Sequence, residues 1–497
     1  MRVVTKTDYL LWRECPKNAW LRLHKPDIFD SFPLTEFDEA IIESGIEVEQ
    51  VARGLFPGGV LIRPTDAEPR GATRAQLAAG VDVLFQPVFE VDRCLAAIDV
   101  LQRNSSTGAH SVFEIKSSSR LKEEHLYDVA FQALLIARKR LNIDQMFVIH
   151  LNREYVRRGA LDLRGLFTFV EVGRSVREIA TTVEREVAEA VPYLLKETEP
   201  SGPCSCIYKG RSAHCTTFRY SNPGVPEYGV HDIARIGNSP SKLREMVDAG
   251  IFTLDRIPAH IPLSEIQRAQ VTAYQSGVAA IHKEGIKGEL ARLEYPLHFI
   301  DYETYPSAIP AFDGFAPHDH IPLQYSLHLL EATDGEPNHR EYVHRSVQDP
   351  SQPFADALRH DVGQRGSVIV WNRRFEVGVN EKLAHRVPRV SEFIAGMNDR
   401  VYDLMDVFSK QYYVRREFLG KVSLKNVLPA LVPEMTYSGL GIREGGTASV
   451  AWKRILFREF DDEERDKVLG QLSAYCERDS YAMYAIWRAL RGLIGLR

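Results

Sequence analysis

The alternation of apolar and polar positions predicts an α/β chain in which helices and short strands follow one another. Apolar positions with a period near 3.6 predict helices over residues 7–23, 36–55 and 123–141, the first interrupted at Cys15-Pro16. Period-2 alternation predicts strands over 81–89, 93–101 and 109–116, the first two paired across a break near Asp92. The N-terminal part is therefore expected to be a sheet with flanking helices.

The second half of the chain repeats this mixture. Strands are predicted over 298–304, 321–331, 340–344 and 367–371, and the last helix over 462–493. A segment rich in Gly, Pro and Ser, residues 200–226, marks a domain edge, and short helices with tight turns follow over 230–279. These turns resemble a helix-hairpin-helix, which holds a nucleic-acid backbone through turn amides; the alternative is a plain helical spacer.

Composition narrows the class of protein. The 497 residues have room for two to four domains, and 44% hydrophobic with 26% charged residues is ordinary for a globular protein. No apolar run approaches a membrane span, and residues 1–17 lack the apolar region of a signal peptide, so we expect a cytoplasmic protein without a membrane partner. Because the net charge is -5, any nucleic-acid surface must be a local basic groove.

Two acids stand two residues apart in the predicted strand over 298–304. Alternate side chains of a strand share a face, so Asp301 and Glu303 point the same way. Two adjacent carboxylates are costly unless a cation lies between them, and magnesium prefers oxygen ligands. The alternative is a half-buried strand whose acids face solvent.

A second set of polar residues follows the N-terminal strands. Asp99 ends one predicted strand, Glu114 and Lys116 lie on the next in an E-x-K pattern, and Gln132 lies on the following helix, one turn after Asp128. Carboxylates on neighbouring strands can hold metal ions, and a lysine beside them can orient an attacking water. E-x-K alone is weak, because any solvent-facing strand can carry it.

The order Asp99, Glu114-x-Lys116, Gln132 resembles the PD-(D/E)XK nuclease fold in its RecB-like branch. The resemblance implies a restriction-endonuclease-like domain over residues 1–225, with Asp99 and Glu114 as ligands of Mg²⁺ or Mn²⁺. It implies catalytic roles for Lys116 and Gln132. The branch often adds an upstream acid or histidine on a helix, and Glu49 or Glu47 occupies that place here. A solvated helix face explains that pair equally.

The chain has six cysteines, and three of them fall within a dozen residues. Clustered cysteines in a cytosolic chain favour a metal site over disulfides. Some RecB-like nucleases carry an iron–sulfur cluster on one cysteine before the nuclease core and three after it, and Cys15, Cys204, Cys206 and Cys215 are similar in position. The resemblance implies a 4Fe-4S cluster, with zinc as the alternative and a metal-free set as a third, although Cys204-x-Cys206 departs from the commoner spacing. His214 is a substitute ligand.

Acids in the second half form a further pattern. The motifs are Asp301-x-Glu303, then Asn372-Arg373-Arg374-Phe375-Glu376 after a buried strand, then Tyr475 with Asp479 one turn later on the last helix. This order resembles the DnaQ-like (DEDDy) exonucleases of the ribonuclease-H-like fold, over residues 291–497. The resemblance implies that Asp301, Glu303, Glu376 and Asp479 bind metal and that Tyr475 orients water. Glu376 departs from the usual aspartate.

Several residues near these motifs suit nucleic-acid binding. Asn372 and Phe375 would support the second motif and the terminal nucleotide, and Arg373 would steady the backbone. Lys425 follows a basic, aromatic run over 412–416, which suits stacking on single-stranded bases. A solvated helix start and a surface loop with core tyrosines are the corresponding alternatives.

The full arrangement resembles a bacterial fusion of a RecB-like nuclease, a helical linker over 226–290 and a DEDDy-like exonuclease. It implies a metal-dependent nuclease acting on DNA ends or single strands, in repair or in defence against foreign DNA. One alternative is an RNA-processing 3′–5′ exonuclease. Another is a nucleic-acid-binding protein with one inactive site. DNA is favoured over RNA as the partner, and the sequence identifies no protein partner.

Overall fold

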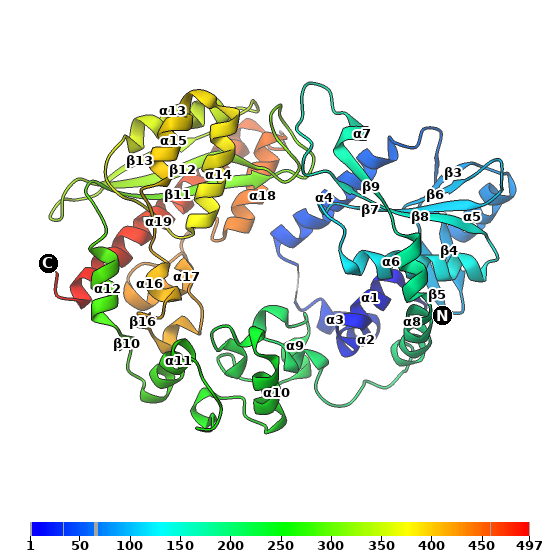
Figure 1. The fold of residues 1–497 in the computed structure, drawn as a ribbon, viewed down its shortest axis with the longest axis horizontal. Coiled ribbons are helices and arrows are strands. Elements are labelled where there is room, and N and C mark those ends of the chain that lie inside the picture. The colour runs from blue at the N-terminus through cyan, green and yellow to red at the C-terminus, as the bar shows by residue number, and fades with distance from the viewer. Residues whose placement is uncertain (1, 33, 64–67, 458, 497) are drawn as a thin grey trace. The chain divides into compact units, whose positions relative to one another are not determined.

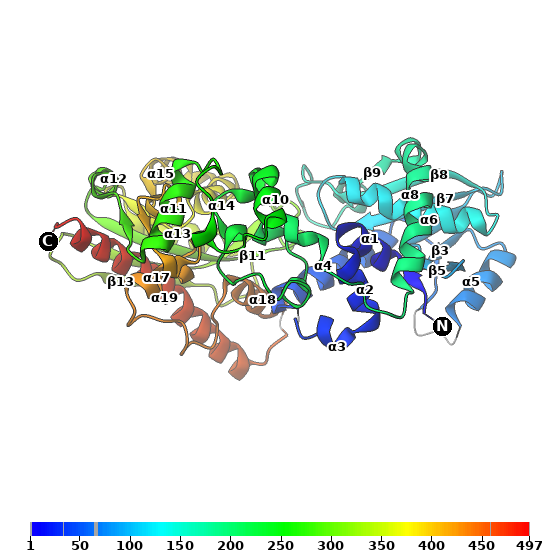
Figure 2. The ribbon, with the colours of Figure 1, turned by 90° about the horizontal axis from the view of Figure 1, so that it is seen from below.

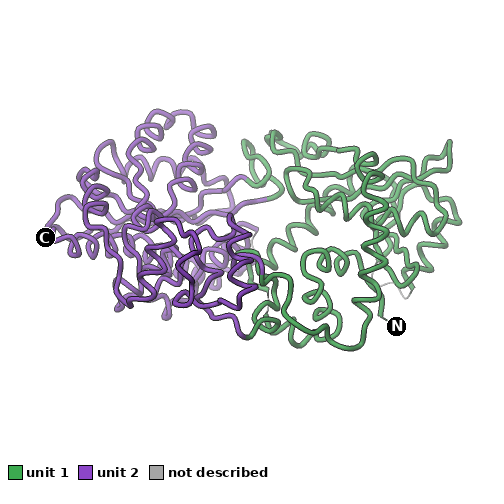
Figure 3. Tube along the Cα trace, turned by 60° about the horizontal axis from the view of Figure 1, so that its bottom comes forward, with its two compact units in different colours: residues 1–207, 212–223, 308–318 green, residues 208–211, 224–307, 319–497 purple. Residues whose placement is uncertain are grey.

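The computed structural model describes residues 2–32, 34–63, 68–457 and 459–496. The chain forms two compact units, drawn in different colours in Figure 3. Unit 1 comprises residues 1–207, 212–223 and 308–318, and unit 2 comprises 208–211, 224–307 and 319–497. Each unit mixes helices with sheets, as expected for an α/β chain, and each is described by itself. The predicted boundaries after residues 225 and 290 stay a prediction.

Unit 1 is built on a six-stranded sheet in the order β2-β3-β6-β7-β8-β9 (Figure 1). Strand β7 pairs antiparallel with β6 and parallel with β8, and it confirms the strand predicted over 109–116. The six strands are β2 (Val60–Leu61), β3 (Val83–Phe85), β6 (Val100–Arg103), β7 (His110–Lys116), β8 (Ile143–Leu151) and β9 (Phe167–Glu171). A smaller sheet has the order β1-β5-β4, from β1 (Val4–Thr5), β5 (Cys94–Ala97) and β4 (Val88–Val91).

The two alternating runs predicted as one strand pair are each divided. Gln86 has φ 53° and separates β3 from β4, and residues 98–99 separate β5 from β6. As a result β4 pairs with β5 in the small sheet, whereas β3 pairs with β6 in the large one. Apolar alternation continues through a positive-φ residue, so the pattern alone does not reveal the change of sheet. The division places Asp99 directly before β6.

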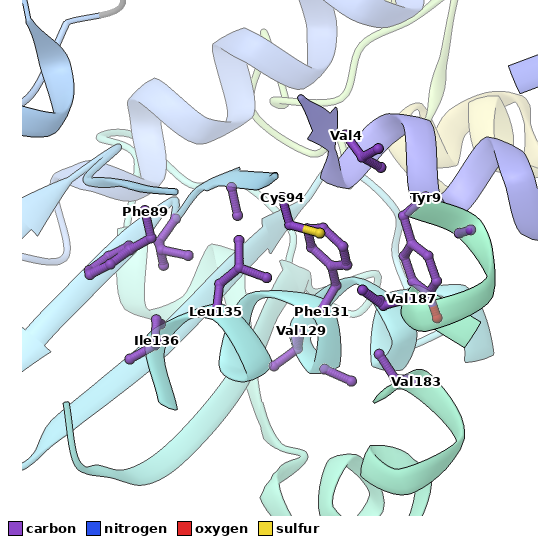
Figure 4. Packing of buried hydrophobic residues seen from close by; sticks show 14 of the residues in the cluster. Val4, Tyr9, Phe89, Cys94, Val129, Phe131, Leu135, Ile136, Val183 and Val187 are labelled. Atoms are coloured by element: carbon purple, nitrogen blue, oxygen red, sulfur yellow. The ribbon is translucent and has the colours of Figure 1, made fainter. Parts of the chain in front are cut away.

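Helices cover both faces of the large sheet of unit 1. Phe131 and Leu135 of α6 pack with Val183 and Val187 of α8 in one buried core (Figure 4). On the other face, Val48 and Ala52 of α4 pack against Phe113 of β7. The helices are α1 (Lys6–Glu14), α2 (Pro16–His24), α3 (Pro26–Phe29), α4 (Glu36–Arg53), α5 (Pro69–Ala78), α6 (Glu123–Arg138), α7 (Leu163–Leu166), α8 (Gly173–Leu194) and α9 (Phe218–Ser221). The helices predicted over 7–23, 36–55 and 123–141 are confirmed.

Unit 2 contains a five-stranded mixed sheet in the order β13-β12-β11-β14-β15. Strands β13, β12 and β11 are antiparallel, and β14 and β15 continue parallel to β11. The strands are β11 (Leu297–Pro306), β12 (His320–Leu330), β13 (Asn338–Val343), β14 (Val368–Val370) and β15 (Val401–Asp403). The predicted strands of this half are confirmed. The pairing of β11 with β12 shifts in register between Glu303 and Thr304, so the end of β11 pairs irregularly with β12.

Alternate residues of β11 enter two different cores. Phe299 packs with Met483 and Trp487 of α19, whereas Ile300 packs with Phe354 of α13 and Val379 of α14. The helices on these faces are α12 (Lys283–Leu290), α13 (Ser351–Val362), α14 (Arg373–Arg386), α15 (Ser391–Asn398), α16 (Asp406–Ser409), α17 (Leu424–Leu431), α18 (Gly445–Leu456) and α19 (Asp462–Leu493). Helix α19 is the long red helix near the C-terminus in Figure 2 and has the predicted bounds.

The segment over 230–279 holds α10 (Pro240–Asp248), α11 (Glu265–Ser276) and short 3₁₀ turns, consistent with the helical prediction. A small sheet then pairs β10 (Ala280–Ile281) with β16 (Tyr413–Val414). Among the described residues, the structure has no helix with the length and hydrophobicity needed to cross a bilayer.

Candidate metal centres

Strand β11 and helix α19 bring three potential ligands together in unit 2. One ligand atom each of Asp301, Glu303 and Cys476 lies within 4.8 Å of the others. The Cys476 Sγ is 3.8 Å from Asp301 Oδ2 and 3.5 Å from the Asp301 carbonyl oxygen. The predicted shared face of Asp301 and Glu303 therefore exists, and it is turned toward α19 instead of solvent. None of the predicted motifs includes Cys476, and only the tertiary structure brings it beside these acids.

The other two predicted acids of this half lie near enough to influence Asp301. Burial raises the pKa of Asp301 well above its usual value, and the nearby charges of Asp479, Glu303 and Glu376 raise it further. Burial and Asp479 likewise raise the pKa of Glu303. Residues separated by up to 178 positions in sequence thus form one cluster, the unit 2 acid cluster (Asp301, Glu303, Glu376 and Asp479).

The buried carboxyl group of Glu376 has one oxygen that no hydrogen bond satisfies among the described residues. Its side chain is 4% exposed, and Oε2 has no hydrogen-bond partner among the described residues. Burial, and then the charge of Asp403, raise the pKa of Glu376 to about 8. An unpaired buried carboxylate beside other acids is a costly arrangement that a divalent cation relieves. The donor set therefore fits a hard metal ion such as Mg²⁺ or Mn²⁺.

A lysine and two tyrosines adjoin the unit 2 acid cluster. Lys425 Nζ lies 5.0 Å from the ring centre of Tyr475 and 5.4 Å from that of Tyr437. The positive charge of Lys425 lowers the pKa of Glu303 and of Asp479, against the rise that burial causes. The Tyr437 hydroxyl donates a hydrogen bond to Asp479 Oδ1. Tyr437 belongs to none of the predicted motifs, and only the tertiary structure brings it to this site.

Three of the four residues predicted to contact nucleic acid lie at the start of α14, just before Glu376. Asn372 caps α14, and its carbonyl oxygen accepts from the Phe375 N–H at 2.9 Å. The backbone N–H of the exposed Arg373 donates to Asp403 Oδ2 at 2.9 Å. The half-buried Phe375 packs edge-on against His320, with ring centres 5.1 Å apart.

The predicted N-terminal residues also come together, in unit 1. Lys116 Nζ lies 2.6 Å from Glu114 Oε1, and Gln132 Nε2 donates to Glu114 Oε2 at 2.5 Å. Lys116 also contacts Asp128, the residue one turn before Gln132. A second ammonium was missed by sequence reasoning: Lys6 Nζ of α1 lies 2.8 Å from Glu114 Oε1 and 3.0 Å from Asp128 Oδ1. No motif contains Lys6, so the sequence offered no signal for it.

Asp99 lies beside this group and accepts two hydrogen bonds. The Ile115 N–H donates to Asp99 Oδ2 at 2.7 Å, and Gln86 Nε2 donates to Oδ1 at 3.1 Å. Gln86 Nε2 also donates to Glu49 Oε1 at 2.6 Å, so of the two upstream acids Glu49 adjoins Asp99. Burial, and then Glu114, raise the pKa of Asp99 to about 7.

The carboxylates around Glu114 in unit 1 and those of the unit 2 acid cluster differ in how far nearby lysines neutralise their charge. Burial opposes ionisation of Glu114, yet Lys116 and Lys6 hold its pKa below the usual value. In the unit 2 acid cluster the pKa values of Asp301, Glu303 and Glu376 are all raised. The chain's own ammonium groups therefore stabilise the charge of Glu114, whereas the acids of unit 2 gain much more from a bound cation.

The four predicted cysteines of unit 1 form one group. The Sγ atoms of Cys15, Cys204, Cys206 and Cys215 all lie within 4.8 Å of one another, and Cys204 and Cys215 are 3.7 Å apart. Cys15 lies between α1 and α2, and Asn222 Nδ2 donates to Cys204 Sγ at 3.1 Å. Hydrogen bonds with the other three thiols lower the pKa of Cys15. The group can bind a metal.

The sulfur spacing bears on the kind of metal. Four thiolates around one zinc ion, with bonds of about 2.3 Å, have sulfurs about 3.8 Å apart. The Cys204–Cys215 separation of 3.7 Å matches this value, and every other pair of the four lies within 4.8 Å. In a 4Fe-4S cubane each thiolate binds a different iron, so the four sulfurs must stand farther apart.

Comparison with known proteins adds a partial family match. Residues 298–423 match a family described as "Domain of unknown function (DUF2779)". That range includes Asp301, Glu303 and Glu376 and ends before α19. The chain thus has a mixed α/β fold with two carboxylate groups and a four-cysteine group, and residues 298–423 of its second half match this family.

Three mycoplasmal relatives are similar to part of the chain. Uncharacterized protein UU173 of Ureaplasma parvum is 26% identical over 229 residues, 41% of this chain and 32% of the relative. The uncharacterized MG366 homolog of Mycoplasma pneumoniae is 23% identical over 230 residues, 43% of this chain and 34% of the relative. Uncharacterized protein MG366 of Mycoplasma genitalium is 24% identical over 215 residues, 39% of this chain and 32% of the relative. The chain spans about a third of the length of these relatives.

Proposed function

We propose that the chain is a metal-dependent nuclease whose principal active site is the unit 2 acid cluster. The observation that carries the proposal is that four carboxylates from β11, α14 and α19, three of them buried, lie near one another, so that Asp479, Glu303 and Glu376 raise the pKa of Asp301. Such a site stores unfavourable like-charge repulsion unless divalent cations bind there.

The chemistry follows from the residues around the cluster. Bound Mg²⁺ or Mn²⁺ would activate a water and stabilise the leaving oxygen of a phosphodiester. Asp301, Glu303, Glu376 and Asp479 would hold the ions. Burial, and then Asp479, raise the pKa of Tyr475, so at neutral pH it is a phenol that can orient water by hydrogen bonding. Lys425 lies beside Tyr475 and can contact a phosphate oxygen.

The strand arrangement supports the finer classification of unit 2. An antiparallel β13-β12-β11 segment continued by parallel β14 and β15, with helices on both faces, is similar to a ribonuclease-H-like domain. With the Tyr475 and Asp479 pair on α19, we assign unit 2 to the DEDDy exonucleases. Asn372, Arg373, Phe375 and Lys425 would hold the nucleic acid. We propose DNA ends or single strands as its substrate, in repair or defence.

Unit 1 is proposed as a RecB-like PD-(D/E)XK domain. This proposal is supported by Glu114 and Lys116 on β7, which contact each other, by Gln132 of α6, which donates to Glu114, and by Asp99 before β6. Because Lys6 and Lys116 both neutralise Glu114, we assign unit 1 a weaker metal site. This observation favours a second candidate function, in which unit 1 mainly binds nucleic acid.

The four-cysteine group is proposed as a metal site that ties the α1–α2 junction to residues 204–215. The resemblance to RecB-like nucleases favours a 4Fe-4S cluster, whereas the sulfur spacing favours one zinc ion. Iron and zinc analysis of anaerobically purified protein, together with its visible absorption, distinguishes the two.

A cleavage assay tests the nuclease. Labelled single-stranded DNA, duplex DNA and RNA are incubated with the full chain and Mg²⁺ or Mn²⁺. We expect cleavage that EDTA abolishes, and that Asp301→Asn lowers by about 10²–10³-fold. Asp334→Asn, an acid in the exposed β12–β13 loop, is the matched control and should retain full activity. The Lys116→Ala variant measures how much of the cleavage depends on unit 1.

The outcome also chooses among substrates. Preference for single-stranded DNA supports the proposed role, and preference for RNA identifies an RNA-processing enzyme instead. Cleavage that survives both EDTA and Asp301→Asn would refute the proposal.

A further inference from the structure

Two histidines and a glutamate of unit 2 form a third group of potential ligands. One ligand atom each of His328, His339 and Glu477 lies within 4.8 Å of the others. His328 of β12 and His339 of β13 are direct cross-strand partners, with ring centres 4.8 Å apart. Glu477 of α19 places Oε1 3.9 Å from His339 Nδ1. Three secondary-structure elements thus contribute one ligand each.

Serine hydroxyls orient both imidazoles. Ser480 Oγ hydrogen-bonds His328 Nδ1 at 2.9 Å, and Ser326 Oγ hydrogen-bonds His339 Nε2 at 2.9 Å. The two serine oxygens are themselves 2.7 Å apart. In metal sites, the second ring nitrogen of a ligating histidine is held by such a partner. The bonds leave His328 Nε2 and His339 Nδ1 for a metal.

This group is separate from the unit 2 acid cluster. Glu477 approaches His339 of β13, whereas Asp479, two residues later on α19, accepts from Tyr437. The ligand types also differ. Two imidazoles with one carboxylate suit zinc, whereas four carboxylates suit magnesium.

We propose that His328, His339 and Glu477 bind one Zn²⁺ ion that ties α19 to the β12–β13 strand pair. Three protein ligands leave a fourth position open to water. The Glu477 side chain is 50% exposed and can move the short distance that tetrahedral coordination requires. Because α19 carries Tyr475 and Asp479, the ion would fix the helix that completes the acid cluster.

Cobalt titration of the chelator-stripped full chain tests the site. Excess Mg²⁺ is added to occupy the carboxylate sites, so that bound Co²⁺ reveals the remaining metal sites. Cobalt bound to the cysteines gives strong sulfur charge-transfer absorption, whereas cobalt bound to nitrogen and oxygen gives visible bands without it. We expect one equivalent of the second kind in the wild type and none in His339→Ala or Glu477→Gln. Zinc content should fall by one equivalent in both variants.

Control variants separate ligation from folding. His360→Ala and Glu336→Gln change an exposed histidine and an exposed glutamate of the same unit and should keep the full equivalent. Ser480→Ala should weaken zinc binding by about 10–100-fold while retaining the site. Zn²⁺ should raise the melting temperature of the wild type more than that of His339→Ala. Equal cobalt and zinc uptake by the wild type, His339→Ala and Glu477→Gln would overturn the proposal and leave a hydrogen-bonded histidine pair only.

Discussion

The ammonium of Lys6 lies 2.8 Å from Oε1 of Glu114, a residue 108 positions away in the sequence. Lys116 contacts the same oxygen from the other end of the E-x-K pattern. Glu114 is 1% exposed, so its charge depends on these two partners. Although burial alone lowers the pKa of Lys6, Glu114 and Asp128 raise it well above the usual value. Lys6 thus supplies positive charge to Glu114 that a bound cation would otherwise have to supply.

Replacing Lys6 by methionine should destabilise unit 1 and strengthen metal binding at the site proposed there. Removing one partner from a buried ion pair typically costs about 3–5 kcal/mol, because the remaining charge stays buried. We expect lower stability in EDTA and a larger stabilisation by Mg²⁺ than in the wild type, measured by chemical denaturation. Lys122→Met, an exposed lysine before α6, is the control. Unchanged stability and unchanged response to Mg²⁺ would contradict the assigned role of Lys6.

Asp301→Asn should stabilise the metal-free protein while it lowers the proposed nuclease activity. The substitution keeps the shape of the side chain and removes one charge from a cluster in which three other acids raise its pKa. Relief of such repulsion at an active site is commonly worth about 0.5–2 kcal/mol. The melting temperature in EDTA at pH 8 should rise, and the stabilisation by Mn²⁺ should shrink. A lower melting temperature in EDTA would show that the four acids do not repel one another.

The cysteine group should be distinguishable from the other cysteines by metal content. Cys204→Ser removes one of the four clustered sulfurs and should lower bound iron or zinc and destabilise unit 1, because metal binding contributes folding free energy. Cys94→Ala changes a buried cysteine in the hydrophobic core and should keep the metal. Elemental analysis with thermal unfolding measures both effects. Equal metal content in the two variants would refute the cysteine site.

Buried His298 should make the protein sensitive to mild acid. Burial lowers its pKa from the usual 6.5 to about 4, and its side chain is 2% exposed. The unfolded chain then binds more protons than the folded chain between these values, so stability is full above pH 6.5 and falls as the pH drops to 4. The loss from this residue is roughly 3 kcal/mol.

His298→Gln tests that dependence. Denaturant midpoints measured from pH 7 to pH 4 should fall less steeply for His298→Gln than for the wild type. His360→Gln, which changes an 84% exposed side chain, should retain the wild-type slope. Parallel pH profiles for all three proteins would exclude a contribution from His298.

Sequence patterns located most of the elements and most of the candidate residues. Helix α19 has the predicted bounds, and the D-x-E pair was correctly placed on one face of a strand. The division of residues 81–101 between two sheets was not predictable, because it depends on a positive φ at Gln86 that leaves the apolar alternation intact. Short-range periodicity indicates which face of a strand a residue occupies, but it does not indicate which sheet the strand joins.

The sequence by itself determined the α/β class and the order of the acidic, lysine and cysteine motifs, because strand and helix periodicity and ligand chemistry are local properties. Only the tertiary structure decided which groups balance one another. It placed Lys6 against Glu114, Cys476 and Tyr437 beside the acids of unit 2, and His328 opposite His339 with Glu477 nearby. Charge compensation and metal coordination depend on distances of a few ångströms between residues far apart in the chain, and those distances exist only after folding.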